Sequence, residues 1–233
     1  MASTDWTPFV NQASSAELVV GATMAPSLSP PDGSFSFGGR ALVSGEKFSG
    51  MLYNGFYPLA SGKGGSIRAY LRKHTPITGT AAYAPMIFFA DDYDMVQDPS
   101  GYILGLSEGA PYYIMLAKGK LSNGLKTTAA GKLQLGTTPY DSAQWIGLRL
   151  DLIHNPQGDL VLDVYYDSAG APAAPVWARP AGISAAFVDD RLGVLSGSLP
   201  NVSQKYMGFG VYTNALGAVA AIDYVRAFQQ LTP

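Results

Sequence analysis

The chain has 233 residues, with 15 basic and 17 acidic side chains, a net charge of −2 and no cysteine. The missing cysteines exclude a disulfide framework and a thiolate metal site. The sparse, balanced charge lacks the basic stripe of a nucleic-acid-binding protein.

Membrane and targeting signals are also missing from the sequence. No apolar run approaches the roughly 18 residues that a membrane helix needs. The start Met1–Trp6 lacks the basic and apolar regions of a signal peptide. We therefore expect a protein made in the host cytoplasm that contacts neither membrane nor nucleic acid.

The composition favours short strands joined by tight turns. Glycine (27), proline (16) and tyrosine (14) are abundant, whereas charged residues make up only 14% of the chain. Glycine and proline are turn residues, and aromatic residues suit pleated surfaces. A chain of this length buries about 70% of its surface as one domain.

Residues 1–33 are rich in alanine, serine and proline and end in a cluster of turn residues at 27–33. They predict an extended N-terminal arm, with a single short β-like run at Glu17–Val20, ahead of one sandwich domain at 34–233. Trp6 and Phe9 are apolar rings on this arm. Because exposed apolar rings mark contact sites, we predict that they bind a partner subunit.

Strand patterns then recur about every ten residues, as a sandwich requires. The clearest is Trp145–His154, where Leu148, Leu150 and Leu152 alternate with charged residues, so one face is buried. A Pro/Ala/Gly-rich stretch at 168–182 predicts irregular structure. The other predicted strands are 35–43, 47–53, 66–72, 85–91, 102–106, 112–117, 159–166, 206–213 and 219–228.

Two segments carry a family resemblance. The hairpin Trp145–Tyr166, with its Trp-x-x-Leu-Arg-Leu-Asp strand and Pro-x-Gly turn, resembles the central hairpin of concanavalin A-like and laminin G-like jelly rolls. The closing pair, Tyr206–Tyr212 and Ala221–Val225, is similar to the last two strands of such domains. The resemblance implies an all-β fold, a two-sheet antiparallel sandwich. This superfamily includes lectins, glucanases, adhesion modules and phage structural proteins.

The catalytic and metal motifs of that superfamily do not carry over. The glucanase pattern Glu-x-Asp-x-x-Glu is absent, and the Asp/Asn/His metal set of legume lectins has no match. Asp151 and Asp163 lie on neighbouring predicted strands, and two carboxylates are what glycoside hydrolysis needs. Cross-strand pairing with a base such as Arg149 is the alternative interpretation.

Three further patterns are candidates for chemistry. The acidic cluster Asp91, Asp92, Asp94 and Asp98 offers carboxylates for calcium, although aspartate is also an ordinary turn residue. Gly105–Gly109 matches the Gly-x-Ser-x-Gly elbow, but a strand pattern follows where the motif needs a helix. His74 and His154 have no companion ligand nearby in the sequence.

Aromatic residues could form a platform for a sugar. Trp6, Trp145, Trp177 and the loop Tyr53–Tyr57 are the candidates. Trp145 heads a strand and is therefore expected in the core.

Together these observations predict a non-catalytic structural or assembly protein of a bacteriophage particle, such as a capsid decoration or a tail or collar component. It would be located in the virion, with copies of itself and other virion proteins as partners. No catalytic residue and no cofactor are assigned, calcium excepted. The alternative is a carbohydrate-binding module for a surface glycan, and a polysaccharide hydrolase or lyase is the third interpretation.

Overall fold

The structure is a computed structural model that describes fifteen stretches of the chain, with gaps between them: 6–10, 16–20, 37–41, 47–53, 64–73, 83–91, 99–107, 111–121, 125, 132–140, 144–154, 159–169, 174–189, 206–213 and 219–230. These stretches form two antiparallel seven-stranded sheets and contain no α-helix. Accordingly, no membrane-spanning helix is found in the described part of the chain.

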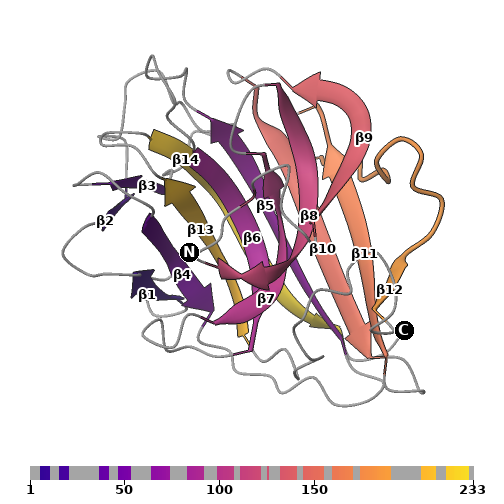
Figure 1. The fold of residues 1–233 in the computed structure, drawn as a ribbon, viewed down its shortest axis with the longest axis horizontal. Coiled ribbons are helices and arrows are strands. Elements are labelled where there is room, and N and C mark those ends of the chain that lie inside the picture. Colours follow the sequence, from indigo (N-terminus) through magenta and orange to yellow (C-terminus); the bar gives the residue numbers. More distant parts are fainter. Residues whose placement is uncertain are drawn as a thin grey trace.

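Sheet A forms one layer of the sandwich (Figure 1). Its strands, in spatial order, are β1 (Trp6–Val10), β4 (Lys47–Tyr53), β13 (Tyr206–Thr213), β6 (Tyr83–Ala90), β7 (Ser100–Leu106), β8 (Tyr112–Lys120) and β9 (Lys132–Tyr140).

Sheet B forms the second layer. Its strands, in spatial order, are β12 (Phe187–Asp189), β11 (Leu160–Asp167), β10 (Ile146–His154), β5 (Gly64–Lys73), β14 (Val219–Gln230), β3 (Phe37–Ala41) and β2 (Ala16–Val20). Figure 1 shows edge strands β9 and β12 on the same side of the molecule, with β1 and β2 on the opposite side.

The all-β, two-sheet antiparallel sandwich confirms the predicted fold class. Each strand predicted from residue 35 onward is present. Three strands were missed: β1, β9 and β12.

The described parts of the predicted N-terminal arm are edge strands. β1 pairs with β4 in sheet A, and β2 pairs with β3 in sheet B. One side of each strand is therefore hydrogen-bonded within the chain, and its other side is an edge of the sheet. Trp6 and Phe9 lie opposite Tyr53 and Gly50. Their side chains are outside the described part, as is the boundary at residue 33, so both partner binding and boundary stay predictions.

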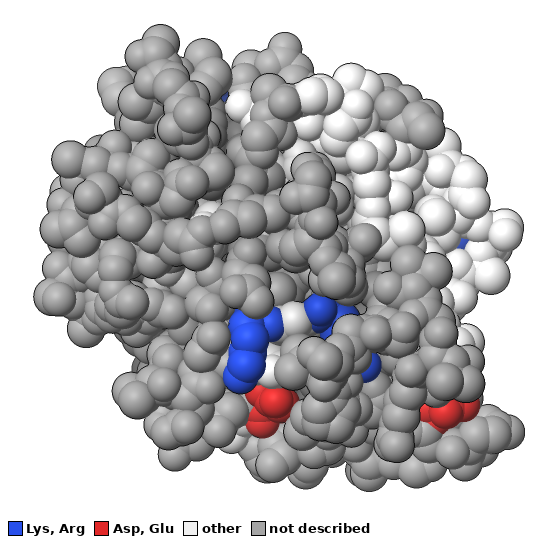
Figure 2. Space-filling model, in the orientation of Figure 1, with Lys and Arg blue, Asp and Glu red and all other residues white. Residues whose placement is uncertain are grey.

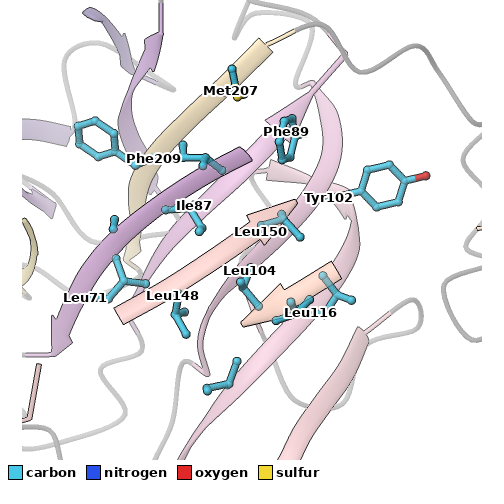
Figure 3. Close-up of a cluster of buried hydrophobic side chains, with 14 of the residues drawn as sticks. Leu71, Ile87, Phe89, Tyr102, Leu104, Leu116, Leu148, Leu150, Met207 and Phe209 are labelled. Atoms are coloured by element: carbon cyan, nitrogen blue, oxygen red, sulfur yellow. The ribbon is translucent and has the colours of Figure 1, made fainter. Parts of the chain in front are cut away.

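The main core lies between the sheets. The inward rows of β10 and β11 are almost fully buried and face apolar residues of sheet A (Figure 3). A fully buried leucine of this kind stabilises the fold by about 1.5–3 kcal/mol. The two facing rows are Leu148, Leu150, Leu152, Leu160, Leu162 and Val164 from sheet B, and Ile87, Phe89, Leu104, Leu116 and Phe209 from sheet A.

A second core covers the other face of sheet A. Phe48 and Phe88 are fully buried there and meet edge to face, with ring centroids 5.8 Å apart. Leu121 and Leu125, which follow β8, are also fully buried in this cluster. Phe48 and Phe88 are therefore core residues.

The outer face of sheet B carries polar side chains, and the absence of a side chain at Gly147 allows two of them to meet. The hydroxyl of Tyr70 on β5 donates a 2.6 Å hydrogen bond to Asp167 Oδ2 on β11. Gly147 on β10 lies between them in the sheet. A Cβ at Gly147 would lie 3.0 Å from the Tyr70 ring and 3.1 Å from Asp167 Cβ. Tyr70 therefore reaches across β10 because position 147 has no side chain.

We expect Gly147→Ala to lower the free energy of unfolding by about 1–3 kcal/mol, since the added methyl group overpacks the site. Urea denaturation measures this value. Gly119→Ala is the matched control, because a Cβ at Gly119 on β8 meets nothing within 4 Å. Equal stability of the two variants would contradict the role given to Gly147.

Candidate functional site

A cavity of about 280 Å³ lies where the edge of sheet A meets the edge of sheet B. β9 supplies one wall, the ends of β10 and β11 supply the base, and a turn near residue 180 supplies the other wall. We call it the edge pocket. Its lining residues are Leu135, Gly136, Pro139, Tyr140, Gln144, Tyr166, Ser168, Pro180 and Ala181.

The first wall exists because β9 is irregular. Tyr140 pairs with Tyr112 and Leu135 pairs with Ile114, so β9 advances five residues while β8 advances two. The extra residues leave the ladder, which is what a bulge does. Gly136 has a φ of 79°, a value that favours glycine. Gln134 Nε2 donates to Gly136 O at 3.0 Å, and this bond fixes the start of the bulge.

Two tyrosines provide the aromatic surface of the edge pocket. Tyr140 and Tyr166 meet edge to face, with ring centroids 6.4 Å apart. Each is half-buried and packs against the main core on one side. Burial, with a smaller effect of Tyr166, raises the pKa of Tyr140 to about 12. Its hydroxyl therefore keeps its proton at neutral pH and remains a hydrogen-bond donor.

The polar groups of the pocket are uncharged and held in place. Gln144 Nε2 donates to Ser168 O at 3.1 Å. The turn that carries Ser168 is fixed by buried Asp167, whose Oδ1 accepts from Ala169 N at 3.0 Å. Tyr70 holds the other oxygen of that carboxylate. An amide and a hydroxyl thus stand beside the two rings.

The second wall belongs to a segment that we call the strap, residues 174–186. Ala178 exchanges two backbone hydrogen bonds with Tyr166, of 2.8 and 3.0 Å. A turn follows, in which Ile183 N donates to Pro180 O at 3.0 Å and Gly182 has a φ of 84°. Pro180 is buried, and the main chain of Ala181 lies about 4 Å from where a Cβ of Gly136 would be.

Arg179 ties the strap to the outer face of β11. Its Nε and Nη2 donate to the two oxygens of Asp163 at 2.9 and 2.6 Å, and its Nη1 donates to Ser184 O at 3.0 Å. The Tyr165 hydroxyl donates to the same carboxylate at 2.7 Å. Partial burial acts to raise the pKa of Asp163, but these hydrogen bonds and the charge of Arg179 outweigh it, so the pKa is lowered.

Asp151 is held in the same way by a different arginine. Arg149 donates to both of its oxygens, at 2.9 and 2.6 Å, from two residues away on β10. Asp151 and Asp163 lie on neighbouring strands, as the sequence predicted, and are directly opposite each other. Each forms a bidentate ion pair. A general acid would need a raised pKa, whereas the pKa of Asp163 is lowered. The two carboxylates therefore act as clamps, as the alternative interpretation held, although the base of Asp151 is on its own strand.

The predicted calcium cluster is described only in part. Asp91 ends β6, where its Oδ1 accepts from Ser100 N at 2.8 Å and its own N donates to Ser100 O at 3.0 Å. This is the turn role of aspartate. Asp92, Asp94 and Asp98 are outside the described residues. No group of three or more metal-ligating side chains occurs among the residues that the structure places, and calcium at the cluster stays a prediction.

Ser107 of the Gly-x-Ser-x-Gly pattern is a hairpin residue. It is fully buried, and its Oγ accepts from Tyr113 N at 3.0 Å, between β7 and β8. A strand follows, so no nucleophile elbow forms. The side chains of His74 and His154 are outside the described part of the structure.

Trp145, expected in the core, is only half-buried. Trp177 lies in the strap and packs on Tyr70, with ring centroids 6.3 Å apart, which places it outside the lining of the edge pocket.

On the face drawn in Figure 2, one group of described basic side chains lies beside an acidic one, and a further acidic group lies apart from them.

Sequence reasoning missed the residues that build the pocket. Tyr140, Gln144 and Ser168 were not singled out, and Tyr166 was taken only as a strand residue. One signal was available: Leu133 and Leu135 alternate as in a strand, and Gly136–Pro139 then interrupts the pattern. An interruption of this kind indicates a bulge.

Solved structures with the same fold are lectin-like domains. The exoplasmic/lumenal domain of VIP36 in a Ca²⁺/Man2-bound form has a TM-score of 0.52 and 13% identity, covering 100% of this chain and 85% of that one. A legume lectin-like domain from Entamoeba histolytica has a TM-score of 0.50 and 8% identity, covering 99% and 91%. No protein-family model and no curated protein matches the chain. The TM-scores show a similar sandwich fold, and at 13% and 8% identity the matches show the fold alone.

We expect the Asp163–Arg179 pair to stabilise the fold in a pH-dependent way. The native pKa of Asp163 lies below the unfolded value of about 3.9. Its contribution is therefore present above pH 4 and is lost as the pH falls through the native pKa. Asp163→Asn should lower the free energy of unfolding at pH 7, by on the order of 1 kcal/mol or less for this partly exposed pair. The difference should shrink as the pH falls through the native pKa.

Denaturation curves of wild type and variant between pH 2 and pH 7 measure this convergence. A difference that stays constant over the whole range would show that the charge of Asp163 contributes nothing.

Proposed function

We propose that the protein is a non-catalytic carbohydrate-binding protein that takes a sugar in the edge pocket. The observation that carries this proposal is the pocket itself. Two half-buried tyrosine rings stand beside an amide and a hydroxyl, in a cavity of about 280 Å³.

The chemistry of the pocket suits a sugar ring. A pyranose presents C–H groups on its faces and hydroxyls around its rim. Aromatic rings pack against the former, while Gln144 and Ser168 can hydrogen-bond the latter. Ligand sites combine apolar walls with a few placed polar groups in this manner, typically over about 300–1,000 Å³. The edge pocket, at about 280 Å³, is just below that range and therefore suits one sugar unit.

The lining also favours an uncharged ligand. None of the residues that border the pocket carries a charged side chain. A buried charge without a partner costs several kcal/mol, roughly, even after relaxation. An anionic sugar would bring such a charge into the pocket.

The fold supports this reading without determining it. The VIP36 domain with the same fold is a Ca²⁺/Man2-bound form. That domain is only 13% identical to this chain. Its ligand therefore suggests which ligands to test, and it assigns no residue of this chain to a binding site. The proposal replaces our first expectation of a phage assembly protein, which the structural relatives do not favour. Location in a virion stays a prediction.

A non-catalytic role agrees with the state of the carboxylates. The candidate pair for hydrolysis, Asp151 and Asp163, is held by two arginines on the outer face of sheet B. Neither residue lines the edge pocket. A sugar bound there would therefore lie away from both carboxylates.

The test is a glycan array followed by calorimetry, with calcium and with EDTA. We expect a neutral glycan to bind the wild type, and Tyr140→Ala and Gln144→Ala each to weaken binding at least about tenfold, equal to about 1.4 kcal/mol. Tyr113→Ala is the control, because Tyr113 is a half-buried tyrosine packed against the second core, on the opposite face of sheet A. Melting temperatures establish that the variants are folded.

Failure of the wild type to bind any glycan, in either buffer, would rule out the proposal. Equal weakening by Tyr113→Ala would place the binding site elsewhere.

A further inference from the structure

We infer that Arg179 is a positioning residue for the edge pocket: it holds the strap against β11 and thereby sets the distance between the pocket walls. That the pocket binds a sugar rests on the proposed function. That Arg179 positions the pocket wall rests on the geometry of the strap. Arg179 itself does not line the pocket.

The wall that Arg179 controls has few backbone attachments in the described structure, although the side chain of Ile183 packs against the main core. Backbone pairing holds the strap at Ala178, opposite Tyr166, and again only where β12 begins at Phe187. Between these two points the chain leaves the sheet and makes the turn at Pro180–Ile183. Pro180 and Ala181, which line the pocket, are in this unpaired section.

Arg179 connects both ends of that unpaired section to the sheet. One edge of its guanidinium group forms a bidentate ion pair with Asp163, which is fixed in the middle of β11. The third nitrogen donates to Ser184 O, on the far side of the turn. The same side chain therefore joins the start of the turn, its end and the sheet. A lysine has one compact ammonium group and cannot make this planar fork.

The position of the turn determines the width of the pocket. The main chain of Ala181 approaches the bulge of β9 at Gly136, and both Gly136 and Gly182 adopt positive φ values. The two walls thus meet as two tight backbone bends. Binding sites have to be held to within about 0.5 Å, and a wall about 1 Å too loose loses the ligand. Release of Arg179 would allow such a shift without altering any lining residue.

The experiment compares Arg179→Lys with Arg149→Lys in the full chain. Arg149 forms a bidentate pair with Asp151 at the same two distances, 2.9 and 2.6 Å, and also lies over the Tyr165 ring. No hydrogen bond joins it to the strap among the described residues. The control thus removes an equivalent bidentate fork from the same sheet face. Asp163→Asn is a second variant, which breaks the anchor from the sheet side.

Two quantities are measured. Hydrogen exchange followed by mass spectrometry reports the amide of Ile183, which closes the turn, and the amide of Ala178, which pairs with β11. Calorimetry reports the affinity for the neutral glycan that the wild type binds. We expect Arg179→Lys and Asp163→Asn to speed exchange at Ile183 and to weaken glycan binding, each about tenfold, while Arg149→Lys changes neither.

Faster exchange at Ile183 with unchanged affinity would overturn the inference, because the strap would then not set the site. Equal effects of Arg149→Lys would also overturn it, since the loss would be one of general stability. If the wild type binds no glycan, the proposed function fails separately. Exchange at Ile183 in Arg179→Lys and Arg149→Lys then decides whether Arg179 holds the pocket wall.

Discussion

The period-two alternation of β10 and β11 is the constraint on which the rest of the site depends. Leu148, Leu150 and Leu152 point into the main core and are fully buried. A slip of one residue would expose all of them, so the register is fixed by burial. The same register turns Arg149 and Asp151 to the outer face, opposite Tyr165 and Asp163. The core therefore also places the groups that hold the strap, and the strap forms a wall of the pocket.

The carboxylates on the outer face of sheet B form hydrogen bonds and ion pairs that hold neighbouring segments in place. A carboxylate poised for acid catalysis needs an environment that raises its pKa. Asp163 has the opposite environment, since Arg179 and Tyr165 both stabilise its charged form. Buried Asp167 is committed to Tyr70 and to the turn at Ala169. Asp163 and Asp167 thus hold the strap and the turn at Ala169 in place. The role of such a carboxylate depends on the partners that the fold places beside it.

The sequence predicted most of the sandwich because its strands alternate and end at turn residues. Trp145–His154 shows this well, since its register follows from the leucines alone. Local reasoning failed where a strand departs from the pattern. β1 lies in an alanine- and serine-rich segment, and only long-range pairing with β4 makes it a strand. β9 was missed because Gly136–Pro139 interrupts it, although this interruption was itself a signal of a bulge. The pocket also depends on Arg179 meeting Asp163, sixteen residues away, and that contact has no local signal.

The edge pocket and the sandwich fold depend on different features of the sequence. The main core requires only that inward positions be apolar and of the right volume, and very different sequences satisfy that requirement. The pocket instead requires two backbone bends, at Gly136 and Gly182, and an anchored strap between β11 and β12. A legume lectin-like domain with 8% identity has a similar sandwich, so the fold alone does not specify the pocket. Because ligands are recognised by such local details, the proposed sugar binding depends on the edge of the sheets and not on the sandwich itself.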